Sequence, residues 1–152
     1  MRAGVDAIPE TDPRARFEAS GRAYFEFAMT HAAHFRVMFR PELADRDKHP
    51  AVDQSGAGAF MVLVECVQGL QAARPAPPGD VLPLVLTGWS TAHGLAALWV
   101  DGPLSRGLPG LGADPKTLVS MVSKSLGHLF AAAGTLSQVV EIGATLVDDR
   151  KA

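Results

Sequence analysis

Residues 80–103 read DVLPLVLTGWSTAHGLAALWVDGP, and this stretch has the clearest helical pattern in the chain. Asp80 can cap the N-terminus of a helix, and Gly102 followed by Pro103 can end it. Between these signals the apolar side chains recur every three or four residues and form one stripe: Val81, Val85, Trp89, Ala92, Ala96 and Trp99. The stretch therefore predicts a single long helix with one buried face.

Two helical segments are predicted before this one, near the N-terminus. Asp12 followed by Pro13 is an N-cap with proline at the first helical position, and apolar residues continue at helical spacing to about residue 30. The segment HAAHFRVMFR at 31–40 has a shorter helical pattern that ends before Pro41. We expect a helix over about 13–30, then one or two helical turns past a kink.

Two further helices are predicted on either side of residues 80–103. An apolar pattern runs from Val52 to Leu70 and stops before the connector RPAPPGD, whose prolines and glycine break a helix. Asp114 followed by Pro115 repeats the cap signature seen near the N-terminus, and apolar residues then recur at helical spacing until Gly134, which can end the helix.

These patterns define one domain of the all-α class. No stretch shows the alternation of apolar and polar residues with tight turns that a sheet needs, so we expect about five helices. With 152 residues, 47% of them hydrophobic, the chain can bury a sizeable core. We place the domain over residues 12–134, with residues 1–11 as an N-terminal extension and residues 135–152 as a tail whose structure the pattern leaves open.

Charge and composition exclude several classes of protein. With 14 basic and 16 acidic residues the net charge is −2, which gives no bulk attraction to phosphate backbones, so this chain alone is a poor candidate for binding nucleic acid. No apolar run approaches the ~18 residues that span a bilayer. The N-terminus lacks the apolar stretch of a secretory signal, and the single Cys66 cannot form an internal disulfide. We expect a soluble, cytoplasmic protein with no membrane partner.

The serine and histidine of the quoted stretch do not form a hydrolase motif. Ser90 lies in GWSTA at 88–92, which lacks the second glycine of the Gly-x-Ser-x-Gly turn that exposes a catalytic serine. Ser90 and His93 are three residues apart and can share a helical face, but no obvious carboxylate orients the imidazole. We therefore expect no catalytic residues and no enzyme.

The sequence also predicts no metal and no cofactor. His31 and His34 have a spacing that can place two imidazoles on one face, but no compact cluster or HExxH pattern accompanies them. The other soft donors are scattered along the chain: Cys66, His93 and His128. Solvated or hydrogen-bonded core histidines are the simpler interpretation. GLPGLG at 107–112 has neither the preceding strand nor the GK[ST] ending of a phosphate-binding loop.

Small residues lie beside large rings in the helix predicted at 80–103. Glycine inside a helix costs up to ~1 kcal/mol relative to alanine, so the two glycines suggest that close packing or a cavity compensates. Two interpretations remain open. One is an ordinary buried helix in a monomeric bundle; in the other, Trp89 and His93 face inward while the opposite face meets a second subunit through Thr87, Thr91, Leu95 and Leu98.

Two motifs together resemble a known family. Trp89-x-x-x-His93-Gly94, closed by Asp101-Gly102, resembles the WHG signature in the C-terminal domain of TetR-type transcriptional regulators. The segment GRAYFEFAMTHAAHFRVMFRPEL at 21–43 is similar to that family's aromatic-rich helix followed by a Phe-Arg-x-Met-Phe run. The two motifs occur in the family's order and extend the resemblance over roughly residues 12–133.

The resemblance implies a sensor of small molecules, in most such families a repressor. In these regulators an N-terminal helix-turn-helix binds the operator, while the C-terminal helical domain encloses an effector and forms a two-fold dimer through its last two helices. Only eleven residues precede Asp12, which are too few for the three-helix DNA-binding domain of such regulators. We therefore expect DNA to be bound only through a helix-turn-helix that is absent from this chain.

The resemblance and the helical faces together give two sets of candidate residues. For a small apolar or aromatic effector, the predicted lining is Tyr24, Phe27, Met38, Phe60, Val64, Trp89 and His93. For the homodimer, the predicted interface is Thr91, Leu95, Leu98, Leu118, Met121, Val122 and Leu129.

The alternative is a stand-alone α-helical bundle that binds a hydrophobic ligand or haem without regulating transcription. An enzyme ranks third, because the sequence shows no titratable pair with mutually supporting geometry.

Overall fold

The computed structural model describes residues 1–40, 50–73, 80–106 and 114–132, the side chains of residues 50–53 excepted. The connector at 74–79, the loop at 107–112, the helix stop expected at Gly134 and the tail at 135–152 lie outside the described residues. Within them the structure is helical and contains no strand, which confirms the predicted all-α class.

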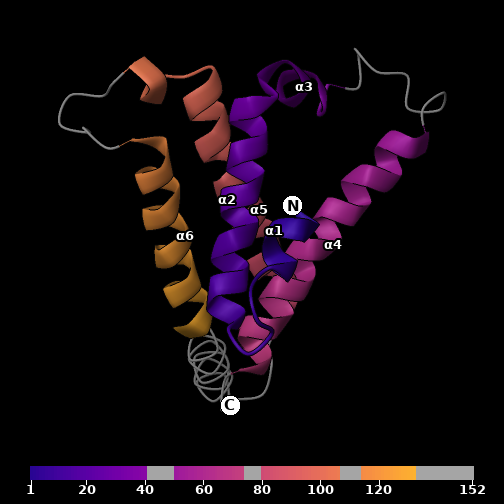
Figure 1. The fold of residues 1–152 in the computed structure, drawn as a ribbon, viewed down its shortest axis with the longest axis vertical. Helices are drawn as coiled ribbons and strands as arrows, with labels where there is room; N and C mark the ends of the chain where they lie inside the picture. The colour runs from indigo at the N-terminus through magenta and orange to yellow at the C-terminus, as the bar shows by residue number, and fades with distance from the viewer. Residues whose placement is uncertain (41–49, 74–79, 107–113, 133–152) are drawn as a thin grey trace, which may run out of the picture.

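The described residues form six α-helices and one short 3-10 helix (Figure 1). They are, in chain order, α1 (Arg2–Asp6), α2 (Pro13–Thr30), α3 (Ala32–Val37), α4 (Pro50–Ala72), α5 (Val81–Val100), η2 (Leu104–Arg106) and α6 (Pro115–Ala132). The five predicted helices correspond to α2 to α6, and α1 is an additional one.

α2 is the central helix of the bundle and packs against each of the other α-helices. In Figure 1 it stands upright between α6 and the slanting α4, with α5 behind it and α1 in front. Small residues let its neighbours approach: a Cβ placed on Gly21 would lie only 2.7 Å from Oγ of Ser123 on α6. The close approach of α2 and α6 therefore depends on glycine at this position.

The predicted helix starts are confirmed by their caps. Asp12 Oδ1 accepts a hydrogen bond from the backbone N–H of Ala15 at 2.9 Å, and Asp80 accepts from that of Leu82 at 3.0 Å. Asp114 accepts from the backbone N–H groups of Lys116 and Thr117 at 2.9 and 3.1 Å. Each carboxylate satisfies backbone donors that the first helical turn leaves without partners.

α1 has no counterpart in the sequence prediction. Five residues are too few to show helical periodicity, and no side chain caps its start. Its position is fixed by packing, because Val5 is 1% exposed in the core. Arg16 of α2 also donates hydrogen bonds to the carbonyls of Val5 and Ile8, at 3.3 and 2.9 Å. The N-terminal extension thus packs as part of the bundle.

The apolar interior consists of two clusters. The first surrounds Phe17 and comprises Val5, Phe17, Ala19, Val62, Leu63, Cys66, Val67, Leu70, Val85 and Phe130. The second surrounds Phe25 and comprises Phe25, Ala28, Phe35, Ala96 and Val119. α2, α5 and α6 each contribute to both clusters, so these three helices connect the two halves of the core.

α5 has the length and mean hydropathy of a membrane span, because its 20 residues include an 18-residue window with a mean hydropathy of 1.3. Its sequence nevertheless includes four polar side chains in its middle: Thr87, Ser90, Thr91 and His93. It packs against α2, α4, α6 and η2, as a bundle helix does. The length and composition of α5 are therefore only weak evidence for a membrane-spanning helix.

Candidate ligand-binding site

His93 lies in the second half of α5 and faces a group of aromatic side chains. The Tyr24 hydroxyl on α2 lies 2.9 Å from its Nδ1 atom. The ring centroid of Phe35 on α3 is 5.1 Å from that of His93, and the centroid of Phe39, just after α3, is 4.8 Å away. Three segments thus meet at one imidazole.

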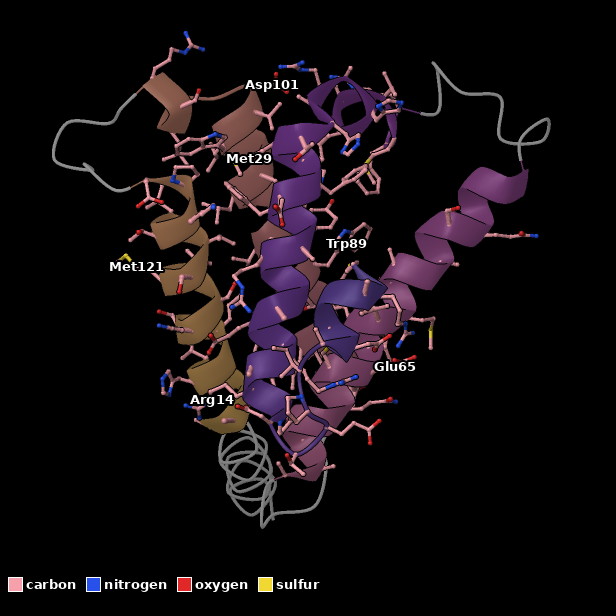
Figure 2. All side chains as sticks on the ribbon, in the orientation of Figure 1. Arg14, Met29, Glu65, Trp89, Asp101 and Met121 are labelled. Atoms are coloured by element: carbon pink, nitrogen blue, oxygen red, sulfur yellow. The ribbon has the colours of Figure 1, made fainter. Side chains whose placement is uncertain are left out.

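Trp89 extends this group by one helical turn toward α4. Its ring lies 5.7 Å from Phe39 and 5.8 Å from Phe60 of α4, measured between centroids. Figure 2 shows Trp89 between α2 and α4. We call Tyr24, Phe35, Phe39, Phe60, Trp89 and His93 the aromatic site.

The aromatic site lies between the two core clusters. Phe60 and Trp89 pack against the first cluster, whereas Tyr24 packs against the second and Phe35 is one of its buried members. His93 contacts the rings of Tyr24 and Phe35, and Phe39 contacts both His93 and Trp89, so Phe39 links the two groups. A molecule bound here would touch both halves of the core.

Both polar members of the site are held in their neutral forms. Burial raises the pKa of Tyr24 to about 12, and a hydrogen bond from the Trp89 side chain opposes that shift. Burial lowers the pKa of His93, because the imidazolium ion would lose solvation there. At neutral pH the site therefore offers a phenol and a neutral imidazole.

α3 is held across the C-terminal end of α5 by an arginine. Arg36 donates from Nε to Asp101 Oδ1 at 2.6 Å and from Nη2 to the Val100 carbonyl at 3.4 Å. The Val100 carbonyl is one of the last in its helix, which leaves it without an intrahelical partner. These contacts place Phe35 and Phe39 over His93.

The structure brings four of the seven predicted lining residues together: Tyr24, Phe60, Trp89 and His93. Val64 packs against the first core cluster and Met38 against the second. Phe27 lies outside the aromatic site, because its ring stacks on His31, with centroids 5.2 Å apart, and makes no ring contact with a member of the site.

The sequence prediction missed Phe35 and Phe39. Their spacing of four residues places both rings on one face of a helical segment, which was the available signal. That face alone could not show that α3 folds back onto α5.

The predicted interface residues differ in how much surface they offer. Leu98, Met121 and Leu129 are 49%, 59% and 63% exposed. Thr91, Leu95 and Val122 are partly buried within the protomer. Leu118 is only 8% exposed, so it can contribute little surface to any interface. Leu82 and Leu86 of α5, which the prediction omitted, are 55% and 43% exposed.

The other candidate chemistries find little geometric support in the described part of the chain. It contains no group of three or more His, Cys, Asp or Glu side chains that could hold a metal ion. His31 and His34 have ring centroids 6.0 Å apart and are exposed. Cys66 is buried, and burial raises the pKa of its thiol.

The described part of the chain is thus an all-α bundle with an aromatic site between its two core clusters. The family model described as "Tetracyclin repressor-like, C-terminal domain" matches residues 17–136. The match spans most of the chain, so the protein belongs to this family of TetR-type C-terminal domains. No curated protein and no solved structure matches the chain.

Family membership gives the coarse function. Domains of this family are the effector-binding parts of transcriptional regulators, and they typically dimerise and bind small molecules.

Proposed function

We propose that this chain is the effector-sensing and dimerisation domain of a cytoplasmic TetR-type repressor, and that the aromatic site is where its effector binds. The operator contacts of such a regulator would be made by a helix-turn-helix outside residues 1–152. The observation that most supports the proposed effector site is the position of His93, which is half-buried among aromatic rings and hydrogen-bonded to Tyr24.

The composition of the aromatic site supports ligand binding. Small-molecule sites are mostly apolar, with a few polar groups that orient the ligand, and this site combines five aromatic rings with one imidazole. Its rings come from α2, α4 and α5 and from the α3 segment. An effector there could therefore change how these helices pack.

Such a change regulates only if the effector binds two arrangements of the dimer unequally. α1 is well placed to transmit it, because it packs on α2 and is joined to α4 by the ion pair between Arg2 and Glu65. A shift of α4 relative to α2 would move α1, the N-terminal helix of the described chain.

Dimerisation is supported by the apolar surface of α5 and α6. Only 17% of the apolar window in α5 is buried within the protomer. Three large apolar side chains on the two helices are between 49% and 63% exposed: Leu98, Met121 and Leu129. Exposed apolar side chains on two helices that contact each other indicate an interaction surface, and a second copy of the chain would cover it.

Native mass spectrometry of the purified chain tests the proposed dimer. Thermal shifts across a panel of apolar and aromatic compounds test the proposed effector binding. We expect a dimer and at least one compound whose stabilisation is lost in His93→Phe. His128→Phe is the matched control, because His128 is an exposed residue of α6 that contacts Arg14 at the start of α2, and α6 contributes no member of the aromatic site. A monomer at all concentrations would contradict the proposed dimerisation. Unchanged compound binding in His93→Phe would contradict the aromatic site as the effector site. Co-purified haem would favour the stand-alone bundle instead.

A further inference from the structure

The Tyr24 hydroxyl and Nδ1 of His93 lie 2.9 Å apart and share one hydrogen bond. Either group can be its donor, because a phenol both donates and accepts and a neutral imidazole has one nitrogen of each kind. The effect of Trp89 on the pKa of Tyr24 favours one direction: an indole N–H can only donate, and a Tyr24 oxygen that accepts from it can donate its own O–H to His93.

With Tyr24 as the donor, the tautomer of His93 follows. A neutral imidazole carries one ring hydrogen, so a ring that accepts at Nδ1 must carry its hydrogen on Nε2. In this arrangement Nε2 of His93 is a hydrogen-bond donor.

The Nε2 donor is left for a ligand. Among the described residues the only hydrogen bond of the His93 ring is the one to Tyr24. Every buried side-chain nitrogen or oxygen in the described structure has a partner, so the unpaired Nε2 is not sealed inside the protein. It is an accessible donor beside the faces and edges of Phe35 and Phe39.

The described side chains that are found against His93 are uncharged. They are Tyr24, Phe35 and Phe39, and Trp89 adjoins them. Burial is the cause of the lowered pKa of His93. An ionised ligand would lose its hydration against these side chains without gaining an opposite charge from them, which is unfavourable.

We propose that the effector is an uncharged molecule with a flat apolar body and a hydrogen-bond acceptor, such as a ketone, ester or quinone carbonyl, that accepts from Nε2 of His93. This inference rests on the proposed function, because it specifies the ligand of the same aromatic site. The aromatic rings would contact the body of the molecule, and the imidazole would select its acceptor.

Three probes of similar shape test whether the site prefers an uncharged hydrogen-bond acceptor, separately from whether it binds aromatic molecules at all. Acetylnaphthalene has an uncharged acceptor, ethylnaphthalene has no polar atom, and naphthoate is charged; the same ring isomer is used throughout. Isothermal titration of each into wild type, His93→Phe and the control His128→Phe gives the affinities. We expect acetylnaphthalene to bind wild type and the control about five-fold more tightly than ethylnaphthalene, as one added hydrogen bond would give, and naphthoate to bind most weakly.

In His93→Phe the preference for acetylnaphthalene should disappear while ethylnaphthalene still binds. If wild type binds all three probes equally, or prefers naphthoate, the inferred ligand class is overturned while small-molecule binding stands. If none of the probes binds, both the ligand class and the aromatic site as an effector site are contradicted.

A second measurement on the wild-type chain is independent of how the variant folds. Nitrogen NMR of histidine-labelled protein distinguishes the ring nitrogen that carries hydrogen from the one that accepts. We expect His93 to be neutral at pH 7.5, about one unit above an ordinary histidine pKa, with its hydrogen on Nε2. A hydrogen on Nδ1, or a charged ring at that pH, would overturn the inference whatever the probes show.

Discussion

The hydroxyl of Tyr24 lies 2.9 Å from Nδ1 of His93, and this contact joins α2 to α5 across 69 residues of sequence. It occurs where the two core clusters meet, beside the rings of Phe35 and Trp89. Because the bond connects two of the three helices that contribute to both clusters, a change at His93 affects the packing of the domain as well as the proposed ligand site.

The lowered pKa of His93 predicts that stability falls in mild acid. The unfolded chain binds a proton at His93 near its ordinary pKa of 6.5, whereas the folded chain binds it only at lower pH. Above the ordinary value both states are neutral and the folded state keeps its full stability. As the pH falls from there to the folded-state pKa, the unfolded state takes up an extra proton, so the free energy of unfolding decreases.

Denaturant unfolding at about pH 7.5 and about pH 5.5 measures this difference. His93→Phe should lose less stability between the two values than wild type does, even though it is less stable overall because Tyr24 loses its acceptor. An unchanged pH dependence in His93→Phe would show that other groups cause the loss in acid.

The exposed methionines of α6 and α4 provide a matched test of the dimer. Met121→Glu places a charge on the proposed interface, where Met121 is 59% exposed in the protomer. Because burying an unpaired carboxylate is costly, we expect the dimer dissociation constant to rise at least about 100-fold. Light scattering after size-exclusion chromatography over a range of concentrations measures it.

Met61→Glu is the control, because Met61 is 49% exposed on α4, outside the α5 and α6 surface. This variant should remain dimeric. If Met121→Glu and Leu98→Glu both remain dimeric, the two copies of the chain do not meet through the exposed surface of α5 and α6, and the proposed interface is wrong.

The sequence predicted the local features of the fold well. Helix starts at Asp12, Asp80 and Asp114 were recognisable because a cap acts on backbone donors within three residues. α1 was missed because its helix depends on tertiary packing of Val5 and on hydrogen bonds from Arg16. Short helices held by such contacts have little sequence signal of their own.

The aromatic site was predictable only in part, for a similar reason. A helical pattern shows which side chains share a face, but it does not show which neighbouring helix that face meets. Phe27 and Phe39 are both aromatic residues near the junction of α2 and α3, yet Phe27 stacks on His31 and Phe39 on His93. The difference depends on the position of α3, which Arg36 fixes through Asp101 and Val100.

Gln71 near the end of α4 should be important for stability. It is 2% exposed, and its Nε2 donates to the carbonyl of Phe130 at 3.0 Å, near the end of α6. Gln71→Leu keeps a similar volume but leaves that carbonyl without this donor, so we expect a loss of about 1–3 kcal/mol in the free energy of unfolding. Gln68→Leu, at an exposed position on the same helix, should change it by less than about 0.5 kcal/mol. Urea unfolding compares the two, and equal effects would argue against a specific role for the bond.

The contact between Gly21 and Ser123 predicts a mutation and its rescue. In Gly21→Ala the new Cβ would lie 2.7 Å from Ser123 Oγ, closer than real Cβ contacts allow, although it would lie 3.7 Å from Ser123 Cβ. Ser123 is 6% exposed and has little room to move, so we expect a loss of about 1–3 kcal/mol from overpacking. Removing the hydroxyl as well, in Gly21→Ala with Ser123→Ala, leaves only ordinary van der Waals contacts and should recover most of the loss.

Gly58→Ala on α4 is the matched control for Gly21→Ala, because no heavy atom lies within 4 Å of its new Cβ. It should raise stability by about 0.5–1 kcal/mol, since alanine is the better helix former. Thermal unfolding of all four variants, with Ser123→Ala alone completing the cycle, gives the coupling energy between the two positions. A coupling near zero would mean that α2 and α6 separate enough to accept the methyl group, and the close approach of the two helices would then not depend on glycine.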